Sequence, residues 1–279
     1  MRVLFLLMIL ALSQPVFAWG ADGHRLTCRI AYDALSAEGK TWVQQTLALG
    51  EHLDGNSSNN LAEACLWPDE ARFNDYKGTY EQHFINMPRG ASRIDFARDC
   101  AAMDCIAVGI QRSLTYLAAE PTSNRERARK AAALRFLGHF IADLHQPLHV
   151  AYGDDWGGNK IQVDWFGQTM NLHAVWDTGI LERAGISYPA SLQSLAALNP
   201  DLGSRNVLDW MQETFNLARS HAYPGIDGQP ILSGAVLTEA YYQRSLPVAS
   251  GQLRLGATRL AWLLDQLARG QFDTNILIN

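Results

Sequence analysis

The chain has 279 residues, of which 48% are apolar, and this is enough for the core of one large domain or two small ones. Its net charge is −5, and the lysines and arginines are scattered along the chain. These features exclude a simple nucleic-acid binder that relies on a basic surface. Any affinity for an anionic substrate must come from local groups, and bound metal is one candidate.

The N-terminus has the pattern of a secretory signal peptide. Arg2 supplies a positive charge, residues 3–12 are almost all apolar, and Val16-Phe17-Ala18 offers small residues at a cleavage site. We expect cleavage after Ala18, which leaves a mature chain that begins at Trp19, is secreted or periplasmic and has lost the charge of Arg2. No later apolar run is long enough to cross a bilayer, and so we expect a soluble protein without a membrane partner.

The periodicity of apolar residues predicts a mostly helical protein. Helical patterns cover residues 26–35 and 41–49, and a polar loop follows over 50–60. A further helix is expected over 61–74, where Asn59 could cap its start and Pro68 should perturb it.

Four cysteines in an exported chain predict two disulfides, for which three pairings are possible. We favour Cys100 with Cys105 as a local link within a loop. This pairing leaves Cys28 with Cys65.

The strongest helical pattern covers residues 124–144, after a weaker one over 106–117. Its second half is apolar nearly all round and should be buried, and Pro147 should end or kink it. A loop rich in glycine and aspartate over 153–158 precedes an alternating run, which predicts a short hairpin that turns at Gly167-Gln168.

Helices are expected again from about His173, Pro189, Ser204 and Val236. The last of them is amphipathic, with leucines on one face up to Leu267. The simplest account is one all-α domain over residues 19–279, a compact multi-helix unit with a short β-hairpin and long active-site loops, linked by disulfides.

Two histidines lie four residues before an aspartate on expected helices. They are His139 before Asp143 and His173 before Asp177. This spacing places imidazole and carboxylate on one helical face, where both can bind a metal. If only one such pair were present, a structural ion pair would be the alternative to a metal site.

Further candidate ligands change that balance. His149 follows Pro147, and three more candidates lie upstream: His24, Asp69 and His83. Histidine, aspartate and a free amine are ligands that zinc accepts when the thiols form disulfides.

Six motifs in order resemble the S1/P1 nuclease family of zinc-dependent, single-strand-specific nucleases. They are Trp19-Gly20 with His24; Trp-Pro-Asp-x-x-Arg from Trp67 to Arg72; His83-Phe84-Ile85; Phe140-Ile141-x-Asp143-x-x-Gln146-Pro147-Leu148-His149; Gly157-Gly158-Asn159; and Asn171-Leu172-His173-x-x-Trp176-Asp177.

The resemblance implies three zinc ions per chain and a set of ligands for each. The first set is Asp69, His83, His139 and Asp143; the second is the amine and carbonyl of Trp19 with His24 and a bridging Asp143; the third is His149, His173 and Asp177. A carboxylate shared by two zinc ions brings them within roughly 3.5–4 Å, and a water held between them becomes hydroxide, the nucleophile, near neutral pH.

The resemblance also implies the reaction and its partners. The expected activity is cleavage of single-stranded DNA and RNA to 5′-phosphate products, with 3′-nucleotidase activity on nucleotides, by a monomer. Arg72, three residues after Asp69, is the candidate to stabilise charge on the phosphate. A surface or helix-end arginine is the alternative for Arg72.

Substrate choice should come from base stacking. Phe84 adjoins one ligand, and Tyr152, Trp156 and Asn159 lie in the loop beside another. Tyr152 and Trp156 could instead pack that loop.

Two residues nearby complete the candidates. Asn86 stands where family members often carry an acid, which excludes a role as base, and Arg89 is a candidate phosphate contact. His52, His145 and His221 fall outside the motifs, and we interpret them as ordinary surface or packing residues.

Two rival functions remain. Bacterial zinc phospholipases C resemble this family in their N-terminal tryptophan and three-zinc site, although the Gly157-Gly158-Asn159 loop favours a nuclease. The other rival is a zinc-binding protein without catalysis.

Overall fold

The computed structural model describes residues 19–50, 60–196 and 201–272. The expected signal peptide over 1–18, most of the expected polar loop, Asn59 and His52 lie outside these residues. No helix in the described ranges is both long and apolar enough to span a membrane.

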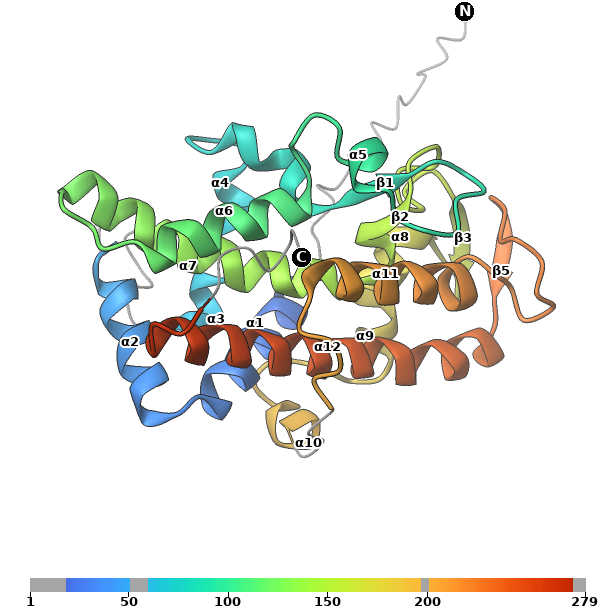
Figure 1. Cartoon of the computed structure of the whole chain (residues 1–279). Helices are drawn as coiled ribbons and strands as arrows, with labels where there is room; N and C mark the ends of the chain where they lie inside the picture. The colour runs from blue at the N-terminus through green and yellow to red at the C-terminus, as the bar shows by residue number, and fades with distance from the viewer. Residues whose placement is uncertain (1–18, 51–59, 197–200, 273–279) are drawn as a thin grey trace, which may run out of the picture.

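Two long helices organise a mostly helical fold (Figure 1). They are α7 (Asn124–Leu144) and α12 (Glu239–Ala268), and they pack against each other and both against α1 (Ala21–Ala34). The side chain of Ser123 accepts a hydrogen bond from the Glu126 backbone amide and caps α7. Every residue of α7 from Lys130 to Leu144 is buried, as the apolar second half of this segment predicts.

The other helices are shorter. In chain order they are α2 (Ala37–Ala48), α3 (Leu61–Ala64), α4 (Trp67–Ala71), α5 (Phe96–Asp99), α6 (Ile106–Ala118), α8 (Leu172–Ala174), α9 (Ile180–Arg183), α10 (Leu192–Ala196) and α11 (Val207–Leu217). Two 3₁₀ helices, η1 (Lys77–His83) and η2 (Pro147–His149), and two π-helical turns, η3 (Val175–Gly179) and η4 (Ala218–Ala222), complete the set.

The helix expected over 61–74 is broken into two. The side chain of Asn60 accepts a hydrogen bond from the Ala62 amide at the start of α3. Pro68 lies in the first turn of α4, where its missing N–H has no helical partner to lose. The break lets α4 take its own direction and turn Asp69 toward α7.

Two small sheets carry the strands. In one, β1 (Ile85–Met87) pairs in parallel with β2 (Val150–Tyr152). In the other, β3 (Gln162–Trp165) and β4 (Gln168–Asn171) form the expected hairpin, and β5 (Ala235–Leu237) joins β3 in parallel. The pattern did not predict β1, β2 or β5, because three residues are too few to show alternation.

The disulfides join Cys28 to Cys65 and Cys100 to Cys105, which is the pairing favoured from the sequence. The first links α1 to the end of α3. A Cβ atom at Gly138 of α7 would collide with the Cys65 sulfur, so glycine is needed for α7 to pack closely on this link. The disulfide and α7 together fix the elements that surround the C-terminal half of α7.

Candidate metal centre

Buried histidines and aspartates from six segments converge around the C-terminal half of α7. Their exposed fractions lie between 0% and 6%, and they are His24, Asp69, His83, His139, Asp143, His149, His173 and Asp177. Buried ionisable groups at this density need partners or a cation, because an uncompensated charge in the interior is costly. The structure thus brings together all eight side chains that the sequence analysis singled out as ligands.

The first group comes from α4, η1 and α7. His139 Nε2 is 3.1 Å from Asp143 Oδ2 and 3.0 Å from His83 Nδ1, and His83 Nδ1 is 3.0 Å from Asp143 Oδ2. Asp69 Oδ1 lies 3.6 Å from His139 Nε2. Four atoms with lone pairs therefore face one point, which is the arrangement of a metal-ligand set.

The second group contains His24, which lies near the other oxygen of Asp143 and near Asp69 and His139. His24 Nε2 is 3.4 Å from Asp143 Oδ1, and its ring stacks on that of His139 with centroids 3.9 Å apart. Trp19 is fully buried, and the Gly20 amide donates to the Asp177 carbonyl at 3.0 Å. Asp143 thus faces one group with each carboxylate oxygen.

The third group is His149, His173 and Asp177. His173 Nε2 is 3.4 Å from Asp177 Oδ2, and His149 Nε2 is 3.9 Å from Asp177 Oδ1. Asp177 lies in the π-helical turn η3, a type of distortion found often at functional sites. The amide of Gln146 donates to Asp177 and orients it. Gln146 belongs to a motif in the sequence, but the spacing of that motif indicates no role for it.

Backbone carbonyls fix the orientation of three of the histidines. The Nδ1 atoms of His139, His149 and His173 donate to the carbonyls of Cys65 (2.7 Å), His83 (2.8 Å) and Gly157 (2.7 Å). Each Nε2 then points into the cluster. Metal-bound histidines are typically held this way by a second hydrogen bond.

Several inward-facing atoms have no hydrogen-bond partner among the described residues. They include His24 Nε2, Asp143 Oδ1 and His149 Nε2. Buried polar atoms are almost always paired, and a cation among these lone pairs would satisfy them. A structural ion pair between His139 and Asp143 alone would leave these atoms without partners. The residues therefore fit a divalent metal better than they fit an isolated ion pair.

The electrostatics support the same interpretation. Burial lowers the pKa of His83 to about 4 and that of His173 to about 3, which keeps both imidazoles neutral at pH 7. Burial opposes ionisation of Asp143, but the charges of His139 and His149 outweigh it and hold its pKa well below the usual value. Neutral imidazoles beside an ionised carboxylate are the protonation states that metal binding requires.

The pKa values of His139 and Asp177 are both raised, which favours the protonated form of each side chain. Burial disfavours a charge on His139, yet the carboxylates of Asp143 and Asp69 raise its pKa. Burial raises the pKa of Asp177 well above its usual value. A divalent cation would displace both protons.

Arg72 lies beside the first group. Its Nη2 is 3.2 Å from Asp69 Oδ1, and the side chain is only 6% exposed. The guanidinium therefore stands next to the carboxylate of Asp69, a candidate ligand, where it can contact an anion bound there.

The loop over 153–160 closes one side of the centre, and Arg89 holds it. Arg89 pairs with both Asp154 and Asp155, and its guanidinium lies 4.2 Å from the centroid of the Tyr152 ring. Asp155 accepts a hydrogen bond from the Gly158 amide at 2.8 Å. These bonds give Arg89 and Asp155 a structural task that sequence reasoning did not indicate.

The candidate substrate residues differ in exposure. Tyr152 is 9% exposed and packs against Phe215 and Tyr223, whereas Trp156 is 64% exposed. The two alternatives for these aromatics are packing of the loop and stacking on a base. Tyr152 packs within the protein, whereas the ring of Trp156 is exposed.

The remaining candidates lie between these extremes. Phe84 and Asn86 are half-buried at β1. Asn159 donates to the Trp156 carbonyl, and its Oδ1 is buried without a hydrogen-bond partner in the described part of the chain.

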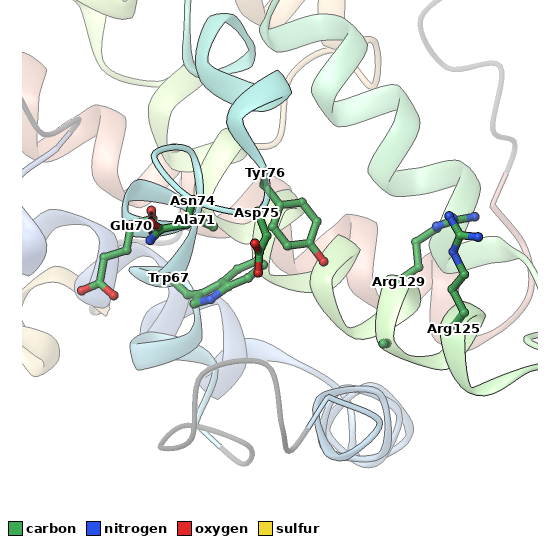
Figure 2. A pocket seen from close by; sticks show the side chains of 9 residues that line it. Trp67, Glu70, Ala71, Asn74, Asp75, Tyr76, Arg125 and Arg129 are labelled. Carbon is green, nitrogen blue, oxygen red and sulfur yellow. Dashed lines mark hydrogen bonds between the residues drawn. The ribbon is translucent and has the colours of Figure 1, made fainter.

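A pocket on the other side of α4 is a separate feature (Figure 2). Its lining includes the aromatic Trp67 and Tyr76, the acidic Glu70 and Asp75, and the arginines of α7, Arg125 and Arg129. Its mixed charges favour neither an anion nor a cation, and we assign it no ligand.

The chain is similar to known nucleases. The family model described as S1/P1 nuclease matches residues 19–269. Endonuclease 1 of Arabidopsis thaliana is 32% identical over 288 residues, which cover 94% of this chain and 90% of the relative. Nuclease S1 of Aspergillus oryzae is 28% identical over 290 residues, with 93% and 95% covered. Nuclease P1 of Penicillium citrinum is 37% identical over 165 residues, 57% of each chain.

Proposed function

The chain belongs to the S1/P1 nuclease family, and we propose that it is a zinc-dependent nuclease that hydrolyses single-stranded DNA and RNA to 5′-phosphate products. The observation that carries the proposal is the convergence of three groups of buried ligand atoms, with His24 and His139 on opposite oxygens of Asp143. Removal of a terminal 3′-phosphate is the same chemistry on a smaller substrate, and we include it.

We assign each group to one zinc ion. Asp69, His83, His139 and Asp143 would hold the first, and His149, His173 and Asp177 the third. The amine and carbonyl of Trp19, with His24 and Asp143, would hold the second. Zinc in such sites lowers the pKa of water toward neutrality and stabilises negative charge on a phosphate.

The protein's own groups position the phosphate and the strand. Arg72 is placed to donate to a phosphate oxygen, because its guanidinium already lies 3.2 Å from Asp69. Phe84 and the exposed Trp156 are placed to stack on bases, and the unpartnered Oδ1 of Asn159 can accept from a base edge. Bases in a duplex are already stacked on each other, so this arrangement favours single strands.

The pairing of Arg89 changes its proposed role. Its guanidinium is bound by two carboxylates, and we propose that it orders the 153–160 loop rather than binding phosphate. Asn86 has no carboxylate and is proposed only as a contact to the base.

We further propose that the mature enzyme acts outside the cytoplasm as a monomer that starts at Trp19. Two disulfides are typical of exported proteins.

Metal content and turnover, measured on one preparation, test the proposal. The mature protein is assayed for zinc and for hydrolysis of single-stranded DNA, duplex DNA, RNA and phosphatidylcholine, before and after chelation. We expect about three zinc ions per chain and chelator-sensitive release of 5′-mononucleotides from the single strands. Release of a phospholipid head group without nucleotides would make the chain a phospholipase C, and zinc without turnover would make it a binding protein.

A further inference from the structure

Three aromatic side chains form a strip that leads outward from the metal centre. The strip consists of Phe84, Tyr80 and Phe73, and Phe84 directly follows the candidate ligand His83. The Tyr80 ring centroid lies 6.1 Å from that of Phe84 and 6.2 Å from that of Phe73. The strip therefore starts at the centre and continues beyond Phe84, the aromatic residue of the His83-Phe84-Ile85 motif.

The outer two rings lie against Arg72. The guanidinium carbon is 5.1 Å from the Phe73 centroid and 5.5 Å from the Tyr80 centroid. The same guanidinium is bonded to Asp69. A phosphate that contacts Arg72 thus places the neighbouring nucleotides of its strand within reach of both rings.

The outer rings are also open. Phe73 is 49% exposed and Tyr80 is 47% exposed, whereas Arg72 beneath them is 6% exposed. Single exposed aromatics need no explanation, but two adjacent ones beside a buried cation at a candidate active site indicate a binding surface.

The spacing of the rings favours one kind of ligand. Bases stacked in a duplex lie 3.4 Å apart along each strand. Centroids 6.1 and 6.2 Å apart cannot each receive a successive base of such a stack. An unstacked strand has extended bases, and every base has a π-face that an aromatic ring can bind without regard to sequence.

We propose that Phe73 and Tyr80 bind the bases of nucleotides beyond the one at the cleaved phosphate, and so make the enzyme select longer single strands. This inference rests on the proposed nuclease function. Both residues add to substrate affinity and take no part in the chemical step.

Length-dependent kinetics test the proposal. The variant that carries Phe73→Ala and Tyr80→Ala together is assayed on an eight-residue oligothymidylate and on a dithymidine monophosphate. We expect KM for the octamer to rise about tenfold or more, since each base stack is lost, and KM for the dinucleotide to change much less. The kcat of the variant should stay close to that of the native protein on both substrates.

Matched variants serve as controls. Phe73→Tyr with Tyr80→Phe keeps both rings and should restore the octamer KM. Leu232→Ala removes an apolar side chain that is 71% exposed and belongs to neither the strip nor the candidate metal centre, and it should leave the kinetics on both substrates unchanged.

Two results would overturn the proposal. An equal loss of kcat on both substrates would mean that the rings only hold Arg72 in place. An unchanged octamer KM would mean that no base binds them.

A binding measurement separates this proposal from the nuclease assignment. Fluorescence anisotropy with a labelled phosphorothioate octathymidylate needs no turnover. If the native protein cleaves nothing, the nuclease assignment fails. A weaker octamer affinity in the double alanine variant would still support the strip, and equal affinities would contradict it.

Discussion

Two kinds of buried histidine lie within a few residues of each other on α7. His139 belongs to the candidate metal centre, and His145 lies at the C-cap of the helix beyond it. His145 donates from Nδ1 to the Ile141 carbonyl at 2.7 Å and accepts at Nε2 from Arg259 Nη1 at 3.0 Å. Both of its nitrogens are thus paired with groups of the protein.

The histidines of the candidate metal centre differ from His145 in what their second ring nitrogen faces. His139, His149 and His173 also use Nδ1 on a backbone carbonyl, but Nε2 faces other lone pairs. Burial is the same in both regions, with His139 and His145 each 0% exposed. The partner of the second nitrogen, rather than burial, therefore separates a structural histidine from a candidate ligand.

Removal of the shared carboxylate should have the largest effect. Asp143→Ala takes away a ligand of two zinc ions, and we expect both to be lost, with activity reduced about 1,000-fold or more, which corresponds to roughly 4 kcal/mol of the barrier. Elemental analysis and single-strand hydrolysis measure the two effects. Loss of a single zinc ion would contradict the bridging role.

Extension of the N-terminus should be nearly as damaging. Residues placed before Trp19 convert its amine into an amide, which cannot serve as a ligand. We expect activity to be abolished while circular dichroism and the disulfides remain unchanged. Full activity of an uncleaved chain would exclude the Trp19 amine from the site.

Displacement of one carbonyl should have a smaller effect. Gly157 has φ +60°, and a Cβ atom there would collide with the Leu148 carbonyl, so Gly157→Ala must shift the carbonyl that holds His173. We expect activity to fall about 10- to 100-fold, as when other second contacts of metal ligands are lost. Gly167→Ala is the control, because Gly167 has φ +84° but nothing within 4 Å. An equal loss in both variants would show that backbone strain alone is responsible.

Replacement of the paired histidine should affect stability and leave metal content intact. His145→Phe leaves the Nη1 of Arg259 without the acceptor it has in the native protein, which costs about 1–3 kcal/mol of unfolding free energy. Urea denaturation and zinc analysis distinguish the outcomes. Loss of zinc in this variant would contradict the purely structural role of His145.

The same histidine should contribute to acid sensitivity. Burial, together with the charge of Arg259, lowers the pKa of His145 to about 3, and in the unfolded chain it is about 6.5. Between these values the unfolded state binds the extra proton, so stability falls as the pH falls, by about 1.4 kcal/mol per unit at most. His145→Phe should make the decline of the urea midpoint from pH 6.5 to pH 4 shallower than in the native protein. An unchanged slope would mean that His145 does not stay neutral when folded.

The sequence predicted much of this arrangement because helical spacing and local motifs are local properties. The i, i+4 pairs, the buried half of α7 and the hairpin at Gly167 all follow from short-range patterns. A perturbation at Pro68 was predicted, but not that it would be a complete break between α3 and α4, because Pro68 is compatible with the first turn of a new helix as well as with a kink.

The remaining features depend on contacts between distant segments. The bonds of Arg89 to Asp154 and Asp155 span more than 60 residues, and β1 meets β2 across a similar distance. The contact of Tyr80 with Arg72 requires η1 to fold back on α4. No periodicity in the sequence reports such pairings.

Anomalous diffraction at the zinc edge, from crystals of the mature protein, tests the central claim most directly. We predict three peaks, each about 2.0–2.2 Å from its ligand nitrogens and oxygens, with Asp143 between two of them. A single peak, or peaks away from the Nε2 atoms of His139, His149 and His173, would contradict the account.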